Sequence, residues 1–211
     1  MIMKQYKLIQ GDCIKVMQSI PDSSIDAIIT DLPYGTTSCR WDSIIPFDSL
    51  WQHYLRIAKP HAPIVLFGYE PFSSVLICSN LKHYKYTLIW CKNNVTGFAN
   101  SKIQPLRAHE NISIFCKKVP TYNPQGLIKI NVQKKNSKSC GGSMLRDVNN
   151  TEGCMRTPGS KYVQEYTNFP KTLIQFKSDI VTYHPTQKPV ALLEYLIKTY
   201  SNKNDIVLDN T

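Results

Sequence analysis

Long apolar runs are missing from this sequence of 211 residues. No segment approaches the roughly 18 consecutive apolar residues of a membrane-spanning helix, which argues against a membrane protein. The start, Met1–Tyr6, leads directly to Asp12 and has neither the apolar core nor the small-residue cleavage site of a signal peptide. We therefore expect a cytoplasmic protein with no membrane partner.

Paired cysteines are missing as well. The seven cysteines are an odd number and include no C-x-x-C pair: Cys13, Cys39, Cys78, Cys91, Cys116, Cys140 and Cys154. This pattern argues against a zinc ribbon and a disulfide scaffold, so we expect reduced, mostly buried thiols and no metal site. A chain of 24.1 kDa with 42% hydrophobic residues suits one domain, or one domain with a substantial insert.

Acidic residues are scarce, with 15 Asp/Glu against 25 Lys/Arg and a net charge of +10. The excess is local, because residues 117–171 contain ten Lys/Arg and three acids, whereas residues 172–211 contain four of each. A polyanion such as nucleic acid is the natural partner for such a segment. A solvated lysine-rich loop would have the same composition, so the charge alone does not distinguish it from a nucleic-acid-binding segment. Nor does the charge distinguish DNA from RNA as the partner.

Strand and helix patterns alternate along the chain. Apolar runs such as 26–30 are typical of parallel strands buried on both faces, and helical spacing marks segments such as 189–200. We expect strands at 6–10, 26–30, 63–68, 84–91, 111–117 and 205–209, and helices at 13–20, 48–58, 71–81 and 189–200. This alternation predicts an α/β fold with an open, mostly parallel sheet and right-handed crossovers.

Three polar clusters follow expected strands: Gly11-Asp12, Asp31–Gly35 and Asp209–Thr211. Ligands of open α/β sheets bind beyond the carboxyl ends of the strands. We therefore expect the functional site at this edge, with the carboxylate of Asp31 and the ring of Tyr34 aimed outward. A simple proline turn with a surface tyrosine is the alternative reading of that tetrapeptide.

Several further blocks accompany this tetrapeptide in a fixed order. They are Leu8–Cys13, Asp31–Tyr34, Trp41-Asp42, Phe67–Phe72, Arg107–Asn111, His184–Pro189 and Asp205–Thr211. Together they resemble the DNA N-4/N-6 amino-methyltransferases that use S-adenosylmethionine, in the arrangement where the catalytic motif precedes the cofactor motif. Asp31-Leu32-Pro33-Tyr34 matches the family's D-P-P-Y loop with Leu in second place, and residues 184–189 match its H-P-T-Q-K-P block.

The resemblance implies a Rossmann-like, class I methyltransferase-like core, with helices on both faces of the sheet. This core would comprise residues 1–116 and 183–211, and residues 117–182 would form a loop-rich, basic target-recognition segment. In the catalytic loop, Asp31 and the backbone carbonyl of Leu32 would accept hydrogen bonds from the target amine. Pro33 would fix the turn, and the ring of Tyr34 would stack on a flipped base.

The resemblance also implies that S-adenosylmethionine is the cofactor. Its expected contacts are Asp12, Cys13, Thr186, Gln187, Lys188, Asp209 and Asn210. In the family, a Gly-rich turn follows the acidic residue of the cofactor motif, whereas this sequence stops at Thr211. Taken alone, this ending predicts weak cofactor binding, and it keeps open a truncated, catalytically inactive DNA-binding protein.

The expected reaction is methylation of adenine N6 in duplex DNA, because an Asp in first place of the tetrapeptide resembles the adenine-acting members. Cytosine-N4 methylation is the alternative enzymatic interpretation. The basic residues expected to follow the DNA backbone are Lys134, Lys135, Lys138, Arg146 and Arg156. The resemblance is also compatible with a homodimer and with a restriction endonuclease partner.

Overall fold

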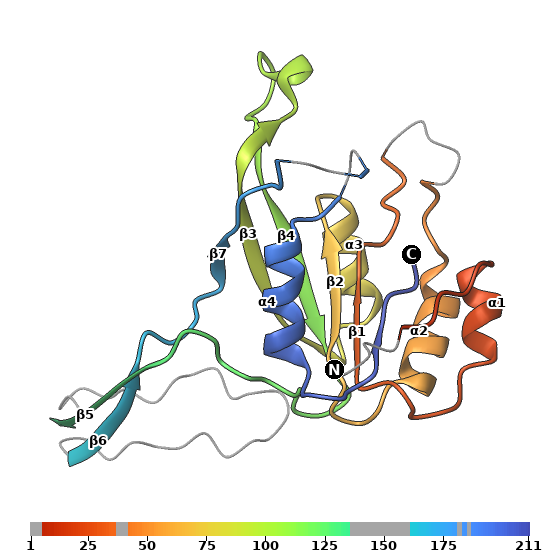
Figure 1. Ribbon diagram of the computed structural model, residues 1–211. Coiled ribbons are helices and arrows are strands. Elements are labelled where there is room, and N and C mark those ends of the chain that lie inside the picture. The colour runs from red at the N-terminus through yellow and green to blue at the C-terminus, as the bar shows by residue number, and fades with distance from the viewer. Residues whose placement is uncertain (1–5, 37–41, 136–160, 181–182, 185–186) are drawn as a thin grey trace. The chain divides into compact units, whose positions relative to one another are not determined.

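The computed structural model describes residues 6–36, 42–135, 161–180, 183–184 and 187–211 (Figure 1). The chain divides into two compact units. One comprises Met1–Asn123 with Lys171–Thr211, and the other comprises Pro124–Pro170. The second unit is shorter than the predicted insert 117–182, because strand β7 (Leu173–Gln175) pairs with the main sheet of the first unit.

The first unit is built on a six-stranded sheet with the order β7-β3-β4-β2-β1-β8. Its other strands are β1 (Ala27–Thr30), β2 (Ile64–Gly68), β3 (Tyr84–Thr96), β4 (Arg107–Phe115) and β8 (Val207–Leu208). The pairs β1–β2, β1–β8 and β3–β7 are parallel, and β4 runs antiparallel to both β2 and β3. The predicted α/β class is confirmed, with a mixed sheet in which parallel pairs prevail.

Helices cover both faces of this sheet because β1 and β2 are buried at every position and, apart from Thr30 at the end of β1, carry no polar side chain. Their side chains point alternately to opposite faces, and all nine residues of the two strands are buried. Ile28 and Leu66 pack into the core beneath helices α1 (Cys13–Gln18), α2 (Phe47–Ile57) and α3 (Phe72–Ser79). Ile29 and Phe67 pack on the other side, in the core that includes α4 (Val190–Tyr200).

The two longest helices follow the predicted spacing. In α2, the buried residues Leu50, Trp51, Tyr54 and Ile57 form one stripe. Helix α4 begins directly after Pro189 and buries one face as well, including Leu192, Leu196 and Tyr200. These contacts attach each helix to its own face of the sheet, and they fix the loops at the helix ends. None of the described helices is long and apolar enough to cross a bilayer.

Three sequence-based expectations need correction. Residues 6–10 form no strand, since both sides of β1 are taken by β2 and β8, and Tyr6 and Leu8 are exposed. The last strand is confined to Val207–Leu208 instead of 205–209. The four described cysteines are unpaired, but only Cys116 among them is buried.

The second unit contains an antiparallel ribbon of two strands, β5 (Ile128–Lys135) and β6 (Lys161–Thr167). Its ladder pairs Lys129 with Tyr166 and Lys134 with Tyr162, and its register shifts between Lys129 and Val132. Neither strand was predicted, because polar residues alternate with only a few apolar ones and most of the side chains are exposed.

Candidate active site

The sheet topology brings four distant segments to one edge, which is the upper edge in Figure 1. Parallel strands β1 and β8 end there, so Asp31 and Asp209 follow them at the same edge. Strand β4 runs the other way, and its first residues lie at this edge because Asn111 pairs with Gly68 at the end of β2. Glu110 therefore approaches from β4, and Lys188 approaches from the segment before α4.

The tetrapeptide Asp31–Tyr34 forms the centre of the site. The hydroxyl of Tyr34 donates to Asp31 Oδ1 at 2.5 Å, and the ammonium of Lys188 donates to Asp31 Oδ2 at 2.5 Å. Leu32 is buried, and the Tyr34 ring packs at 5.0 Å from that of Phe72. Burial, and then the charges of Asp31 and Glu110, raise the pKa of Tyr34 well above its ordinary value. Tyr34 is consequently a neutral donor that orients Asp31.

Asp42 stabilises the turn after this tetrapeptide. Its buried carboxylate accepts hydrogen bonds from the backbone N–H groups of Gly35 at 2.9 Å and Thr36 at 3.0 Å. Gly35 has a φ of +66°, and a Cβ atom there would lie 2.9 Å from Cγ1 of Ile44. In the sequence, Asp42 belongs to the Trp41-Asp42 block that resembles the family, but no role for it was predicted.

An ion-pair network extends from Asp31 into the sheet. Lys188 Nζ lies 3.3 Å from Glu110 Oε2, and the other oxygen of Glu110 pairs with Lys92. The side chains of Lys188 and Glu110 are each only 11% exposed, against 31% for Asp31. The Lys188 ammonium also lies 5.8 Å from the Tyr34 ring centroid. The sequence did not lead us to predict Lys92 and Glu110 as site residues. The position of the acidic Glu110 next to the expected strand 111–117 could have indicated it.

A second polar cluster lies at the end of β8. The Thr30 hydroxyl donates to Asp209 Oδ1 at 2.7 Å, and the Tyr54 hydroxyl donates to Asn210 Oδ1 at 2.5 Å. Asn210 Nδ2 is buried and has no hydrogen-bond partner among the described residues. The Thr211 hydroxyl donates to the backbone carbonyl of Asp31 at 3.1 Å, which connects this cluster to the Asp31 loop.

Cys13 belongs to the surroundings of this second cluster. Burial, and then the charges of Cys13 and Asp209, raise the pKa of Tyr54 well above its ordinary value. Asp12 caps helix α1, since its Oδ1 accepts a hydrogen bond from the Lys15 N–H at 3.0 Å. Of the predicted cofactor contacts, Asp209 and Asn210 thus lie in the second cluster, Cys13 acts on Tyr54 beside it, and Asp12 caps the helix that begins at Cys13.

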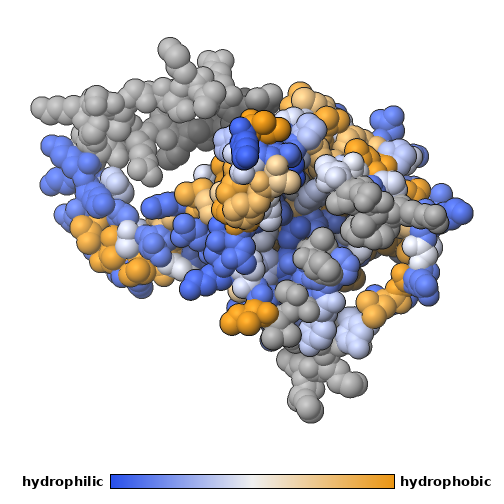
Figure 2. Space-filling model, turned by 90° about the horizontal axis from the view of Figure 1, so that it is seen from above, coloured by the Kyte–Doolittle hydropathy of each residue, from blue (hydrophilic) through white to orange (hydrophobic). Residues whose placement is uncertain are grey.

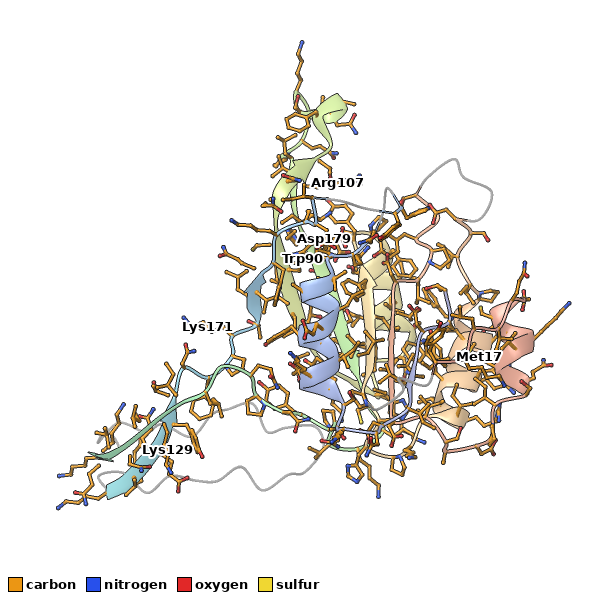
Figure 3. All side chains as sticks on the ribbon, viewed as in Figure 1. Met17, Trp90, Arg107, Lys129, Lys171 and Asp179 are labelled. Atoms are coloured by element: carbon orange, nitrogen blue, oxygen red, sulfur yellow. The ribbon has the colours of Figure 1, made fainter. Side chains whose placement is uncertain are left out.

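Gln187 has a different environment from Lys188. Its Nε2 donates to Asp179 at 3.1 Å, and Asp179 also accepts the Val190 N–H at the start of α4. Asp179, labelled in Figure 3, thereby fixes the segment that carries Lys188. Lys134 and Lys135 lie on β5 of the second unit and are exposed. Thr186, Lys138, Arg146 and Arg156 lie outside the described residues.

Figure 2 looks from above, onto this edge of the first unit, where hydrophilic and hydrophobic residues are interspersed over the coloured surface. Among the described residues, no group of three or more His, Cys, Asp or Glu is arranged to hold a metal ion.

Comparison with known proteins identifies the family. Residues 25–210 match the N6_N4_Mtase family of DNA methylases. This chain belongs to the N6/N4 DNA methylase family. It is 31% identical over 219 residues to the type II methyltransferase M.HpaI of Haemophilus parainfluenzae, with 96% of the chain covered, and it spans 62% of the length of that relative. It is 25% identical to the DNA adenine methyltransferase YhdJ of Escherichia coli, over 96% of the chain and 69% of that protein.

Solved structures support the fold of this N6/N4 DNA methylase family member. The crystal structure of the M1.HpyAVI–SAM complex has a TM-score of 0.54 and 22% identity, covering 95% of this chain and 80% of that one. The cytosine-N4-specific PvuII DNA methyltransferase has a TM-score of 0.62 and 14% identity, covering 94% of this chain and 71% of that one. The predicted Rossmann-like class is thereby confirmed.

Proposed function

We propose that this chain transfers a methyl group from S-adenosylmethionine to N6 of adenine in duplex DNA. The observation that carries the proposal is the Asp31–Tyr34 loop, whose acid is oriented at the carboxyl edge of the sheet beside Asp209 and Asn210. The similarity to M.HpaI, a type II methyltransferase, supports the activity, and the similarity to YhdJ, a DNA adenine methyltransferase, supports both the activity and the base. The fold does not separate adenine from cytosine, because the PvuII enzyme is cytosine-N4-specific.

The target amine is a weak nucleophile, because its lone pair is delocalised into the ring of the base. In our proposal, Asp31 and the carbonyl of Leu32 each accept one N–H of that amine, which localises the lone pair on nitrogen. The Asp31 carboxylate also stabilises the positive charge that develops on nitrogen during transfer. The proton that the methylated nitrogen then loses passes to this carboxylate and from there to water. Pro33 keeps the two acceptors on one turn.

Tyr34 has two roles in this mechanism. Its hydroxyl orients Asp31 through the 2.5 Å hydrogen bond, and its ring offers a surface on which a flipped base stacks. Stacking on an aromatic side chain contributes about 1–3 kcal/mol per base at nucleic-acid sites. Contact with Phe72 fixes the plane of the ring. The base is thereby held close to the methyl donor, and such positioning supplies a large part of catalysis.

The second cluster fits the proposed cofactor. The buried Nδ2 of Asn210, which has no partner in the part of the chain that the structure describes, is a donor available to an acceptor of the ligand. The exposed carboxylate of Asp209 suits hydroxyl or ammonium groups. S-adenosylmethionine, when bound, supplies a methyl group already activated on a sulfonium. We assign Asp12, Cys13, Asp209 and Asn210 to its binding. Lys188 is assigned to the target side instead, because its ammonium pairs with Asp31 and Glu110.

The β5–β6 ribbon is our candidate for contact with duplex DNA. Antiparallel pairing and side-chain alternation give it a contact face, which consists of Lys129, Val132, Lys134, Tyr162, Gln164 and Tyr166. This face has two lysines and no acid, whereas Lys135, Lys161 and Glu165 lie on the opposite face. The DNA major groove admits a two-stranded ribbon. Figure 3 labels Lys129 on this ribbon.

The proposal is tested by methyl transfer from labelled S-adenosylmethionine to unmethylated duplex DNA. Asp31→Asn is expected to abolish incorporation while calorimetric binding of the cofactor stays at the wild-type level. The matched control is Asp48→Asn, the same chemical change at an exposed position in the first turn of α2. Incorporation at the wild-type rate by Asp31→Asn would refute the proposed role of Asp31.

A further inference from the structure

Asp31 and three neighbouring charges form a chain of ion pairs in which the sign alternates from one residue to the next. Lys92 of β3 pairs with Glu110 of β4, Glu110 lies beside Lys188, and Lys188 pairs with Asp31 after β1. In the β3–β4 ladder Glu110 is opposite Trp90, so Lys92 is its diagonal neighbour across the two strands. The inner members are largely buried, and the local charges balance.

Each oxygen of Asp31 already accepts one hydrogen bond in this arrangement. Its Oδ1 accepts the Tyr34 hydroxyl and its Oδ2 accepts the Lys188 ammonium. Each oxygen could accept a second bond, but a target amine that approaches Asp31 along the direction of Tyr34 or of Lys188 displaces the donor there. The Tyr34 ring is held by Phe72, with centroids 5.0 Å apart, so its hydroxyl is the less movable donor. Lys188 has a flexible side chain and a second carboxylate beside it.

Glu110 has unused capacity to accept that ammonium. Its Oε2 is buried and makes no hydrogen bond with the described residues, although Lys188 Nζ lies only 3.3 Å away. A small movement of Nζ would form this bond and release Asp31 Oδ2. A buried ammonium without a partner is strongly unfavourable, so Lys188 leaves Asp31 readily only where another carboxylate receives it.

We propose that Glu110 is a positioning residue that takes the Lys188 ammonium when the target amine binds Asp31. The inference rests on the proposed function, because it needs an amine as the incoming donor. Lys92 holds the other oxygen of Glu110 and thereby keeps Oε2 directed at Lys188. Lys188 remains paired in both arrangements, and the position that its ammonium held on Asp31 Oδ2 is freed for the target amine.

Single-turnover methyl transfer by Glu110→Gln tests this role. We expect a rate about 100-fold below wild type, the order of effect that follows from leaving a buried charge unpaired, with unchanged retention of DNA and cofactor. The matched control is Glu70→Gln at the same edge, where the carboxylate accepts hydrogen bonds from Ser74 and Asn111. We expect this control to stay close to the wild-type rate. Glu110→Asp, which keeps the charge, is expected to recover part of the rate.

A spectroscopic readout separates positioning from folding. In protein labelled with ¹⁵N-lysine, the Lys188 ammonium signal, assigned with Lys188→Arg, should shift when duplex DNA and cofactor are added to wild type. In Glu110→Gln this shift should be lost. Wild-type rate and shift in Glu110→Gln would refute the inference and leave the proposed function intact. A wild-type chain that transfers no methyl group and shows no shift would refute both.

Discussion

Asp42 provides the sharpest prediction about the catalytic loop. Its carboxylate receives two backbone N–H groups, those of Gly35 and Thr36, just after the Asp31–Tyr34 tetrapeptide. The substitution Asp42→Asn keeps the size of the side chain but leaves one acceptor oxygen in place of two. Its NH₂ group then faces an N–H group of the loop, so that two donors oppose each other in a buried place.

The size of the effect follows from these bonds. A hydrogen bond to a charged group contributes about 1.5–3 kcal/mol. One such bond is lost and the other loses its charge assistance, so the closed loop should be destabilised by about 2 kcal/mol, or ~30-fold in its opening equilibrium. Since the loop carries Asp31 and Tyr34, we expect the methyl-transfer rate to fall by a similar order at subsaturating DNA.

Hydrogen exchange measures this opening directly. The amides of Gly35 and Thr36 should exchange ~30-fold faster in Asp42→Asn than in wild type, while amides in β2 keep their rates. Asp48→Asn, at an exposed position of α2, is the matched control. Exchange of the Gly35 and Thr36 amides at wild-type rates in Asp42→Asn would contradict the assignment of Asp42 as the anchor of the loop.

Three further predictions concern stability and DNA contact. Leu196→Ala should lower the free energy of unfolding in urea by about 3 kcal/mol, because Leu196 is fully buried on the inner face of α4. A loss below about 1 kcal/mol would contradict that packing. Burial raises the pKa of Asp26, but hydrogen bonds from Lys59 and the Ile206 N–H, with the Lys59 charge, lower it overall. The ionised Asp26 carboxylate therefore stabilises the fold above its ordinary pKa of about 3.9, and this stabilisation is lost as pH falls through the lowered pKa. In urea titrations taken below about pH 4, the wild type should lose more stability than Asp26→Asn. Equal losses would refute this prediction. Replacing Lys129 and Lys134 by Gln should weaken DNA retention and reduce by about 2 the slope of log affinity against log salt concentration. The matched replacement of Lys135 and Lys161, on the opposite ribbon face, should have a smaller effect. Equal effects would argue against the contact face.

The sequence predicted those elements whose burial pattern is local. Strands β1 and β2 are continuous apolar runs up to Thr30 and Gly68, and helix α2 shows its stripe from Leu50 to Ile57, so all three are recognisable without a partner. Strand β7 has three residues and becomes a strand only through pairing with β3. The reverse holds for residues 6–10, where apolar residues find no neighbouring strand and remain exposed.

The site was predicted in part for a similar reason. Asp31, Tyr34 and Asp209 stand directly after strands, where chain order alone predicts a ligand edge. Lys92 and Glu110 reach the site through the antiparallel register of β3 and β4, which is a long-range property. The contact between Lys188 and Asp31 joins residues 157 positions apart, and no spacing in the sequence indicates it.

The identity of the methylated base tests the central claim most directly. The chain would be incubated with labelled S-adenosylmethionine and unmethylated bacterial DNA, and the digested nucleosides would be identified by mass spectrometry, with Asp31→Asn in parallel. We predict N6-methyladenine in the wild-type digest and none from Asp31→Asn. N4-methylcytosine would contradict the assigned base, and DNA retained without any methylated nucleoside would contradict the proposed activity of this chain.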